Sequence, residues 1–339
     1  MLKRGRSSLR PSHSNSIMSL ISDRAVELAA SGQVAEAVRI LSDASRAGEA
    51  DADFQLGLWL FSGQYLVRKL AVARQAFARA AAAGHGRAGA IYIAFVANGT
   101  GAPPDWREAV RLLTSAAASD PVSAKQLALI RAMNLADDGA PRNISAFEQP
   151  CPIDTIRLFR GLFSAAECDY LIETARPLLE PSVVIDPKSG AAVRDPIRTS
   201  DVAAFPLALE DPVIHQLNCR LAAATGTNVQ QGEPLQVLRY LQGQEFRPHV
   251  DTLPFEPNQR VATALVALNQ GYEGGETAFL EFDFQWRGSL GDALIFSNVT
   301  ADGSPDSKLR HAGRPVTAGE KMLASRWIRA RPLDLGDNV

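Results

Sequence analysis

Small residues recur at a fixed step of 36 residues through the first third of this chain. Alanines in such a repeat let paired helices approach closely, and glycines at the same step end the helices. A repeat of this length is typical of stacked helical hairpins that form a solenoid. Residues 20–136 therefore predict an α-helical repeat domain. The small residues that are separated by 36 positions form five sets: Ala37 with Ala73 and Ala109; Ala44 with Ala80 and Ala116; Ala52 with Ala88 and Ala124; Gly48 with Gly84; and Gly63 with Gly99.

The segments on either side of the repeats have a different composition. Residues 1–19 mix lysine and arginine with serine, which predicts a disordered basic tail. Residues 137–150 contain Asp137-Asp138-Gly139 and two prolines, a composition typical of a linker. The remaining residues, 151–335, predict a second domain of a different class.

Global composition excludes several function classes. The net charge of −2 and the sequence pI of about 6.2 show no excess of positive charge of the kind that attracts nucleic acid. No apolar run reaches the length of a membrane span, so we expect no membrane partner. The three cysteines have neither a disulfide framework nor metal-type spacing, which favours a reducing, cytoplasmic location.

The second half of the chain predicts helices followed by antiparallel strands. Ser164 with Glu167 three residues later forms a capping box that begins a helix, and another helix is expected from Pro212 to Ala224. Short apolar or alternating segments follow, separated by Gly, Pro and Asn. This order favours two packed sheets supported by helices. The predicted strands are Leu235–Leu241, Val261–Leu268, Thr277–Leu280, Ala293–Phe296 and Lys321–Ile328.

Two potential metal ligands, His249 and Asp251, are separated by one residue. Side chains at i and i+2 of a strand share a face, so both can bind one ion from one strand. His311, from another strand, completes two histidines and one carboxylate, a set that suits Fe(II) with open coordination positions. A turn after His311 is expected to put Lys321 on the next antiparallel strand, where it can bind a distal carboxylate. By spacing alone, a zinc site or solvated side chains remain alternatives.

Further segments in order around these ligands resemble the prolyl 4-hydroxylase branch of the Fe(II)/2-oxoglutarate-dependent dioxygenases. The resemblance implies a double-stranded β-helix (jelly roll) with supporting helices. Within the repeats, residues 52–57 and 80–86 are similar to Sel1-type repeats, which are relatives of the tetratricopeptide repeat. The segments that carry the first resemblance are Phe163-Ser164 with Glu167-Cys168, Arg198-Thr199-Ser200, Gln236-Val237-Leu238-Arg239-Tyr240, Gly274-Gly275-Glu276-Thr277, His311-Ala312-Gly313 and Gly319-Glu320-Lys321.

The resemblance implies a role for each matching position. His249, Asp251 and His311 bind iron, and Lys321 pairs with the far carboxylate of 2-oxoglutarate. Tyr240 and Thr263 line the cosubstrate pocket, with strand packing as the alternative. Five residues match positions around a peptide substrate, although the arginines could instead form structural ion pairs: Arg198, Ser200, Glu233, Arg260 and Trp327.

The implied activity is hydroxylation of a C–H bond, first of all in a peptidyl proline, using Fe(II), O2 and 2-oxoglutarate and releasing succinate and CO2. Ascorbate is the implied reductant, the expected partner is a protein or peptide substrate, and the repeats are expected to bind a further protein. Phe246 stands where the family has tyrosine, which weakens the inference of a proline substrate. Alternatives are another amino acid, a small molecule, or an interaction module that carries an idle oxygenase domain.

Overall fold

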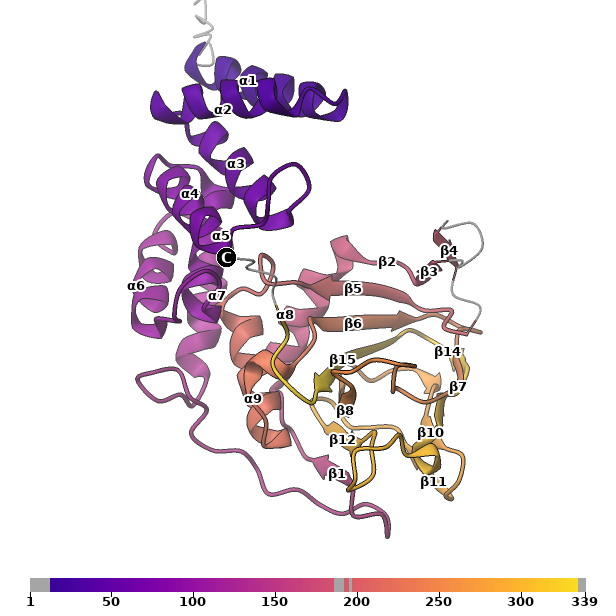
Figure 1. The fold of residues 1–339 in the computed structure, drawn as a ribbon. Coiled ribbons are helices and arrows are strands. Elements are labelled where there is room, and N and C mark those ends of the chain that lie inside the picture. The colour runs from indigo at the N-terminus through magenta and orange to yellow at the C-terminus, as the bar shows by residue number, and fades with distance from the viewer. Residues whose placement is uncertain (1–12, 186–191, 195–196, 335–339) are drawn as a thin grey trace, which may run out of the picture. The chain divides into compact units, whose positions relative to one another are not determined.

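A computed structural model describes residues 13–185, 192–194 and 197–334. The described chain divides into two compact units, residues 13–105 and residues 106–334, each of which is considered by itself. Helices dominate the first unit and strands dominate the second (Figure 1).

The helices keep the step of 36 residues that the alanines predict. Helices α2 (Val34–Arg46), α4 (Leu70–Ala82) and α6 (Trp106–Ala116) alternate with α3 (Ala50–Ser62), α5 (Gly86–Asn98) and α7 (Pro121–Ala132). Ala37, Ala73 and Ala109 are all completely buried, and the glycines that end the helices, such as Gly63 and Gly99, have positive φ. The helical repeat is therefore confirmed, although Ala124 is exposed and leaves the pattern.

Both ends of the repeat region differ from their sequence-derived bounds. Helix α1 (His13–Ala30) begins inside the predicted tail, while residues 1–12 lie outside the described residues. At the other end, α6 and α7 group with the strands, because Gln126 of α7 donates to the hydroxyl of Tyr170 at 2.9 Å. Lys125 also pairs with Glu173. The linker at 137–150 thus stays a prediction, while packing places a division between residues 105 and 106.

Two antiparallel sheets form the second unit. The larger has the strand order β1-β12-β8-β15-β6-β5-β2, and the smaller has the order β11-β10-β13-β7. This arrangement confirms the jelly roll with supporting helices. The strands of the larger sheet are β1 (Ile156–Phe159), β2 (Glu180–Pro181), β5 (Asp201–Phe205), β6 (Leu235–Tyr240), β8 (Arg260–Ala267), β12 (Ala293–Ser297) and β15 (Lys321–Arg329). Those of the smaller are β7 (Phe246–His249), β10 (Thr277–Phe279), β11 (Phe284–Trp286) and β13 (His311–Gly313). Two short hairpins add β3 (Val183–Ile185) with β4 (Ala192–Arg194), and β9 (Glu273–Gly274) with β14 (Val316–Ala318).

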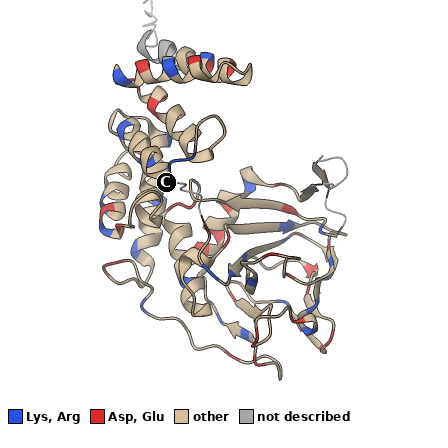
Figure 2. Cartoon of the chain, in the orientation of Figure 1, with Lys and Arg blue, Asp and Glu red and all other residues tan. Residues whose placement is uncertain are grey.

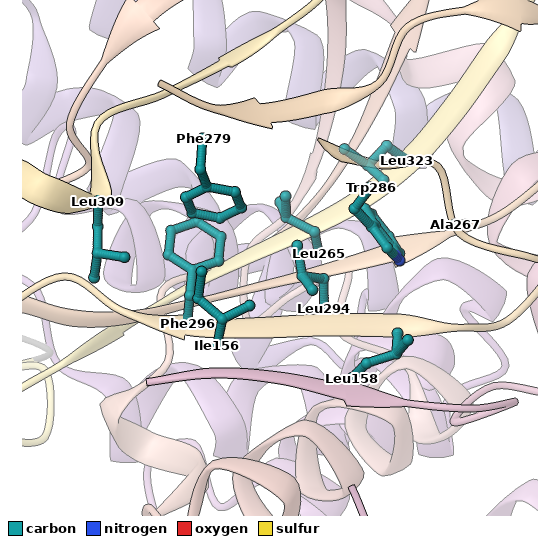
Figure 3. Close-up of a cluster of buried hydrophobic side chains, with 10 residues drawn as sticks. All are labelled: Ile156, Leu158, Leu265, Ala267, Phe279, Trp286, Leu294, Phe296, Leu309 and Leu323. Carbon is teal, nitrogen blue, oxygen red and sulfur yellow. The ribbon is translucent and has the colours of Figure 1, made fainter. Parts of the chain in front are cut away.

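An apolar core fills the space between these sheets. Phe279 of the smaller sheet meets Phe296 of the larger sheet edge to face, with ring centroids 5.1 Å apart. Leu265 and Leu323 extend the cluster across the larger sheet (Figure 3). Fully burying one such side chain contributes about 2 kcal/mol, so this cluster fixes how the two sheets face each other.

Two helices flank the larger sheet. Helix α8 (Ala165–Ala175) begins with the predicted capping box, in which Ser164 accepts from the backbone N–H of Glu167 and the Glu167 carboxylate accepts from that of Ser164. Helix α9 (Pro212–Thr225) begins at the Asp211 cap and ends at Gly226. Acidic and basic residues are interspersed along both units (Figure 2). None of the helices within the described ranges combines the length and apolarity that a membrane span requires.

Candidate metal and cosubstrate site

Two histidines face each other on neighbouring strands of the smaller sheet. His311 on β13 is the register partner of His249 on β7, and their ring centroids are 4.3 Å apart. Nδ1 of His249 lies 2.8 Å from the carbonyl of Arg247, and Nδ1 of His311 lies 3.0 Å from that of Leu309. A carbonyl can only accept, so each Nδ1 carries the proton. Both Nε2 atoms are thereby left as lone-pair donors for a metal.

Asp251 comes from the turn after β7 and not from the strand itself. Strand β7 ends at His249, which corrects the expectation that one strand carries both ligands. The Asp251 carboxylate nevertheless lies 3.6 Å from Nε2 of His249 and 3.6 Å from Nε2 of His311. One ligand atom from each of the three residues lies within 4.8 Å of the others, a spacing that one cation can bridge.

A buried hydrogen-bond chain holds the Asp251 carboxylate in place. Thr263 on β8 donates its hydroxyl to Oδ2 of Asp251 at 2.6 Å, and the side-chain amide of Asn298 donates to that hydroxyl at 2.9 Å. The hydroxyl of Thr263 thus contacts a potential metal ligand, while its contact with a cosubstrate stays a prediction. Asn298 is missing from the sequence-based site because it follows β12, and no local signal links it to residue 251.

The environment sets the protonation states that a cation requires. Burial, followed by the neighbouring charge of His311, lowers the pKa of His249 to about 4, so its ring is neutral at pH 7. Burial by itself raises the pKa of Asp251, but the two histidines and Thr263 outweigh burial and lower it. The Trp327 indole also lowers this pKa, although its N–H lies outside hydrogen-bond geometry. The contact between the indole and the carboxylate is therefore electrostatic.

Lys321 approaches from the opposite sheet. It begins β15 in the larger sheet, beside Tyr240 of β6, and is therefore not on a strand adjacent to β13 as the sequence suggested. Its Nζ donates to the carbonyl of Gly275 at 2.6 Å and lies 5.3 Å from the centre of the Tyr240 ring. Only 4% of Lys321 is exposed, and within the described chain it forms no salt bridge. Burial lowers its pKa to about 8.

The charge of Glu276 offsets part of the cost of burying this ammonium, but without a salt bridge the burial remains costly and points to an anionic ligand that the protein must accommodate. The metal cluster and Lys321 line one pocket with about 400 Å³ of empty space. The pocket lining also includes Tyr240, Phe246 and Trp327. A ligand with a carboxylate at one end and metal-binding oxygens at the other fits the charges of this lining.

The five residues matched to substrate positions occupy different environments. Trp327 lines the pocket, while Glu233 and Arg260 form an ion pair with Nε 2.6 Å from Oε1. Ser200 is buried, with its hydroxyl 3.2 Å from that of Ser182. The guanidinium of Arg198 lies 5.6 Å from the centre of the Phe246 ring. Their contact with a substrate stays a prediction.

Phe246 has a local role that the sequence did not reveal. Its ring stacks on His249 with centroids 3.5 Å apart and planes 15° apart. Phe279 and Phe296 similarly enclose His311, at 5.6 Å and 4.9 Å between centroids. These aromatic contacts hold both imidazole planes in place. Two histidines, one carboxylate and open positions are the donor set of oxygen-activating Fe(II) sites.

The sequence model of the 2OG-Fe(II) oxygenase superfamily matches residues 235–329, a range that contains both histidines, Asp251 and Lys321. Prolyl 4-hydroxylase 1 of Arabidopsis thaliana is 35% identical over 196 residues, covering 52% of this chain and 69% of that protein. Another Arabidopsis relative, named probable prolyl 4-hydroxylase 7, is matched over 64% of its length. The chain thus spans about two thirds of these relatives.

Two solved structures are each similar to part of the chain. The collagen prolyl hydroxylase of Paramecium bursaria Chlorella virus-1 covers 54% of this chain and 100% of the viral chain, at 27% identity and a TM-score of 0.43. A Sel1 repeat protein of Oxalobacter formigenes covers 33% of this chain and 49% of its own, at 21% identity and a TM-score of 0.30.

Proposed function

Because this chain belongs to the prolyl 4-hydroxylase branch of the 2OG-Fe(II) oxygenase superfamily, we propose that it hydroxylates a peptidyl proline with Fe(II), O2 and 2-oxoglutarate. The observation that carries the proposal is the shared pocket. His249, Asp251 and His311 offer a three-ligand metal site, and the buried Lys321 lies in the same lining and forms no salt bridge with the described residues.

When bound, iron with 2-oxoglutarate supplies the oxidising power for C–H hydroxylation, and the cosubstrate leaves as succinate and CO2. The protein's residues supply geometry. The carbonyls of Arg247 and Leu309 keep both Nε2 atoms unprotonated for the metal. Thr263 orients the Asp251 carboxylate, and Lys321 binds the far carboxylate of the cosubstrate.

A groove beside the metal ligands supports a peptide as the substrate. Val250, which lies between the two ligands His249 and Asp251, lines it together with Leu253 and Phe255. Phe255 is fully exposed and has a φ of +59°, a strained conformation for a non-glycine residue. An exposed aromatic ring held in this way offers an apolar anchor to an extended peptide.

The activity test uses the full chain with Fe(II), ascorbate and 2-oxoglutarate labelled at the carboxyl group that is attached to its keto carbon. We expect CO2 release that increases with proline-rich peptides, and a mass gain of one oxygen on a proline. His311→Ala should abolish release, while His85→Ala, a histidine change in the helical repeats, should not alter it. Oxidation of lysine, or of a free amino acid, would reassign the substrate. No release under any condition would support the idle-domain alternative.

Ascorbate as reductant, a cytoplasmic location and a protein partner on the repeats belong to the same proposal. A reductant restores iron after turnover without substrate, and three free cysteines suit a reducing compartment.

Stacked helical hairpins commonly present a surface that binds a protein. Affinity capture with residues 13–105 deleted, compared with the full chain, tests the last point.

A further inference from the structure

A second group of reactive side chains lies on helix α9 and in the segment just before it, outside the lining of the metal pocket. Nδ1 of His215 is 2.7 Å from Oε1 of Glu210, and Nε2 of His215 is 3.5 Å from Sγ of Cys219. His215 and Glu210 are more than nine-tenths buried, whereas Cys219 is partly exposed. A nucleophile, a base within hydrogen-bond reach and a carboxylate that orients the base form the arrangement that activates thiols.

Basic and acidic side chains from two elements lie around the sulfur. Glu210 contributes one negative charge, and Arg326 of β15 is a buried cation that interacts with both Glu210 and Cys219. Burial by itself lowers the pKa of His215, but Cys219 and Glu210 outweigh burial and raise it to about 10. His215 and Arg326 thus place two basic groups close to the sulfur.

The other charged groups near this part of α9 are already engaged. Asp211 caps the helix and accepts from the Tyr170 hydroxyl at 2.5 Å. Arg220 pairs with Glu167 at 2.7 Å. Neither therefore supplies an alternative partner for the sulfur.

An unsatisfied amide lies beside the same group. Asn218 is completely buried, and neither Oδ1 nor Nδ2 has a partner within hydrogen-bond geometry. It is nevertheless close enough to Glu210 to contribute to lowering the pKa of that carboxyl. A buried amide without partners leaves hydrogen-bonding capacity for an additional polar atom in this region.

We propose that Cys219 is a redox modification site, at which a peroxide converts the thiol to a sulfenic acid. The sulfur attacks one oxygen of hydrogen peroxide, so an S–O bond forms while the O–O bond breaks. The thiol proton passes through His215 to the departing oxygen, which leaves as water. The sulfur loses two electrons and the peroxide gains them, and no further reagent is needed.

The chain contains its own controls for reactivity. Cys151 is also partly exposed but has no described histidine within hydrogen-bond reach, and Cys168 is completely buried, which raises the pKa of its thiol to about 12. A base within hydrogen-bond reach can accept the thiol proton as the sulfur reacts, so Cys219 should react about tenfold faster than Cys151.

The experiment treats the full chain, loaded with redox-inert Zn²⁺ in place of iron, with hydrogen peroxide and dimedone at pH 7. Peptide mass spectrometry then gives the labelling rate of each cysteine. We expect Cys219 to be labelled about tenfold faster than Cys151, with Cys168 unlabelled. Equal rates at Cys219 and Cys151, or faster labelling of Cys151, would overturn the proposal.

Two variants identify the cause. His215→Gln should lower the Cys219 rate to that of Cys151, and an unchanged Cys219 rate would remove His215 from the proposal. Labelling of Cys168 in that variant would show that the variant has unfolded. In that case, the labelling rates of Cys219 and Cys151 in the wild-type chain test the proposal. Cys219→Ser should lose the label and keep 2-oxoglutarate turnover, because this site is separate from the metal pocket. Persistence of the label would place the reactive thiol elsewhere.

Discussion

Replacing Lys321 by methionine should stabilise the protein while removing its use of 2-oxoglutarate. A pKa of about 8 in place of 10.5 means that keeping this ammonium charged at pH 7 costs about 3 kcal/mol. Methionine keeps the length of the side chain but leaves the Gly275 carbonyl without its donor, which costs about 1–2 kcal/mol. The net gain of about 1–2 kcal/mol corresponds to a rise of about 4 °C in Tm.

The pH dependence gives a second signature of the same charge. The pKa of Lys321 is lower in the folded chain than in the unfolded chain, so between pH 8 and 10.5 the unfolded state binds more protons. Stability linked to this group therefore rises with pH through that window. Tyr240 and Glu276 lie near the ammonium and are present in both proteins, so the difference between wild type and variant isolates Lys321.

The assay measures urea unfolding and thermal melting of the metal-free full chain from pH 7 to 10, followed by melting of the metal-loaded chain with 2-oxoglutarate. Lys308→Met, at an exposed lysine, is the matched control and should change neither quantity. The stability advantage of Lys321→Met should shrink as pH rises above 8. A variant that is less stable than wild type at pH 7, or that still gains stability from 2-oxoglutarate, would refute the reasoning.

Three further outcomes are expected. Thr263→Val removes the donor to Asp251 at nearly constant volume and should weaken Mn²⁺ or Fe(II) affinity about tenfold by calorimetric titration; unchanged affinity would contradict the orienting role. Glu233→Gln leaves the Arg260 and Arg329 charges under-compensated and should cost about 3 kcal/mol in urea unfolding; a loss limited to peptide affinity would instead identify Glu233 as a substrate contact. Phe246→Tyr keeps the ring stack on the metal-binding histidine, so metal affinity should not change, and any change in the peptide KM reports the added hydroxyl.

Local patterns predicted the elements closely. The capping box at Ser164 begins α8, and the predicted strand at Lys321–Ile328 is β15 with one more residue. These features depend on residues only a few positions apart, so the local sequence is enough to predict them. The helical repeat was predicted for the same reason, because burial of Ala37 and its equivalents recurs at a fixed step.

Features that depend on pairing between distant segments were missed or misplaced. The hydrogen bond from Asn298 through Thr263 to Asp251 joins residues from three separate segments. The ion pairs of Glu233 with Arg260 and Arg329 also join residues that are far apart in the chain. No periodicity in the sequence records such contacts.

Patterns in the sequence were enough to predict a helical repeat, a β domain and the four site residues His249, Asp251, His311 and Lys321. Tertiary structure alone decided how these groups act together. Packing of the two sheets puts Lys321 opposite the histidines and removes it from water, which lowers the pKa of its ammonium. Spacing along a chain specifies which groups can share a face, but the charge state of a buried group depends on everything that surrounds it in the folded protein.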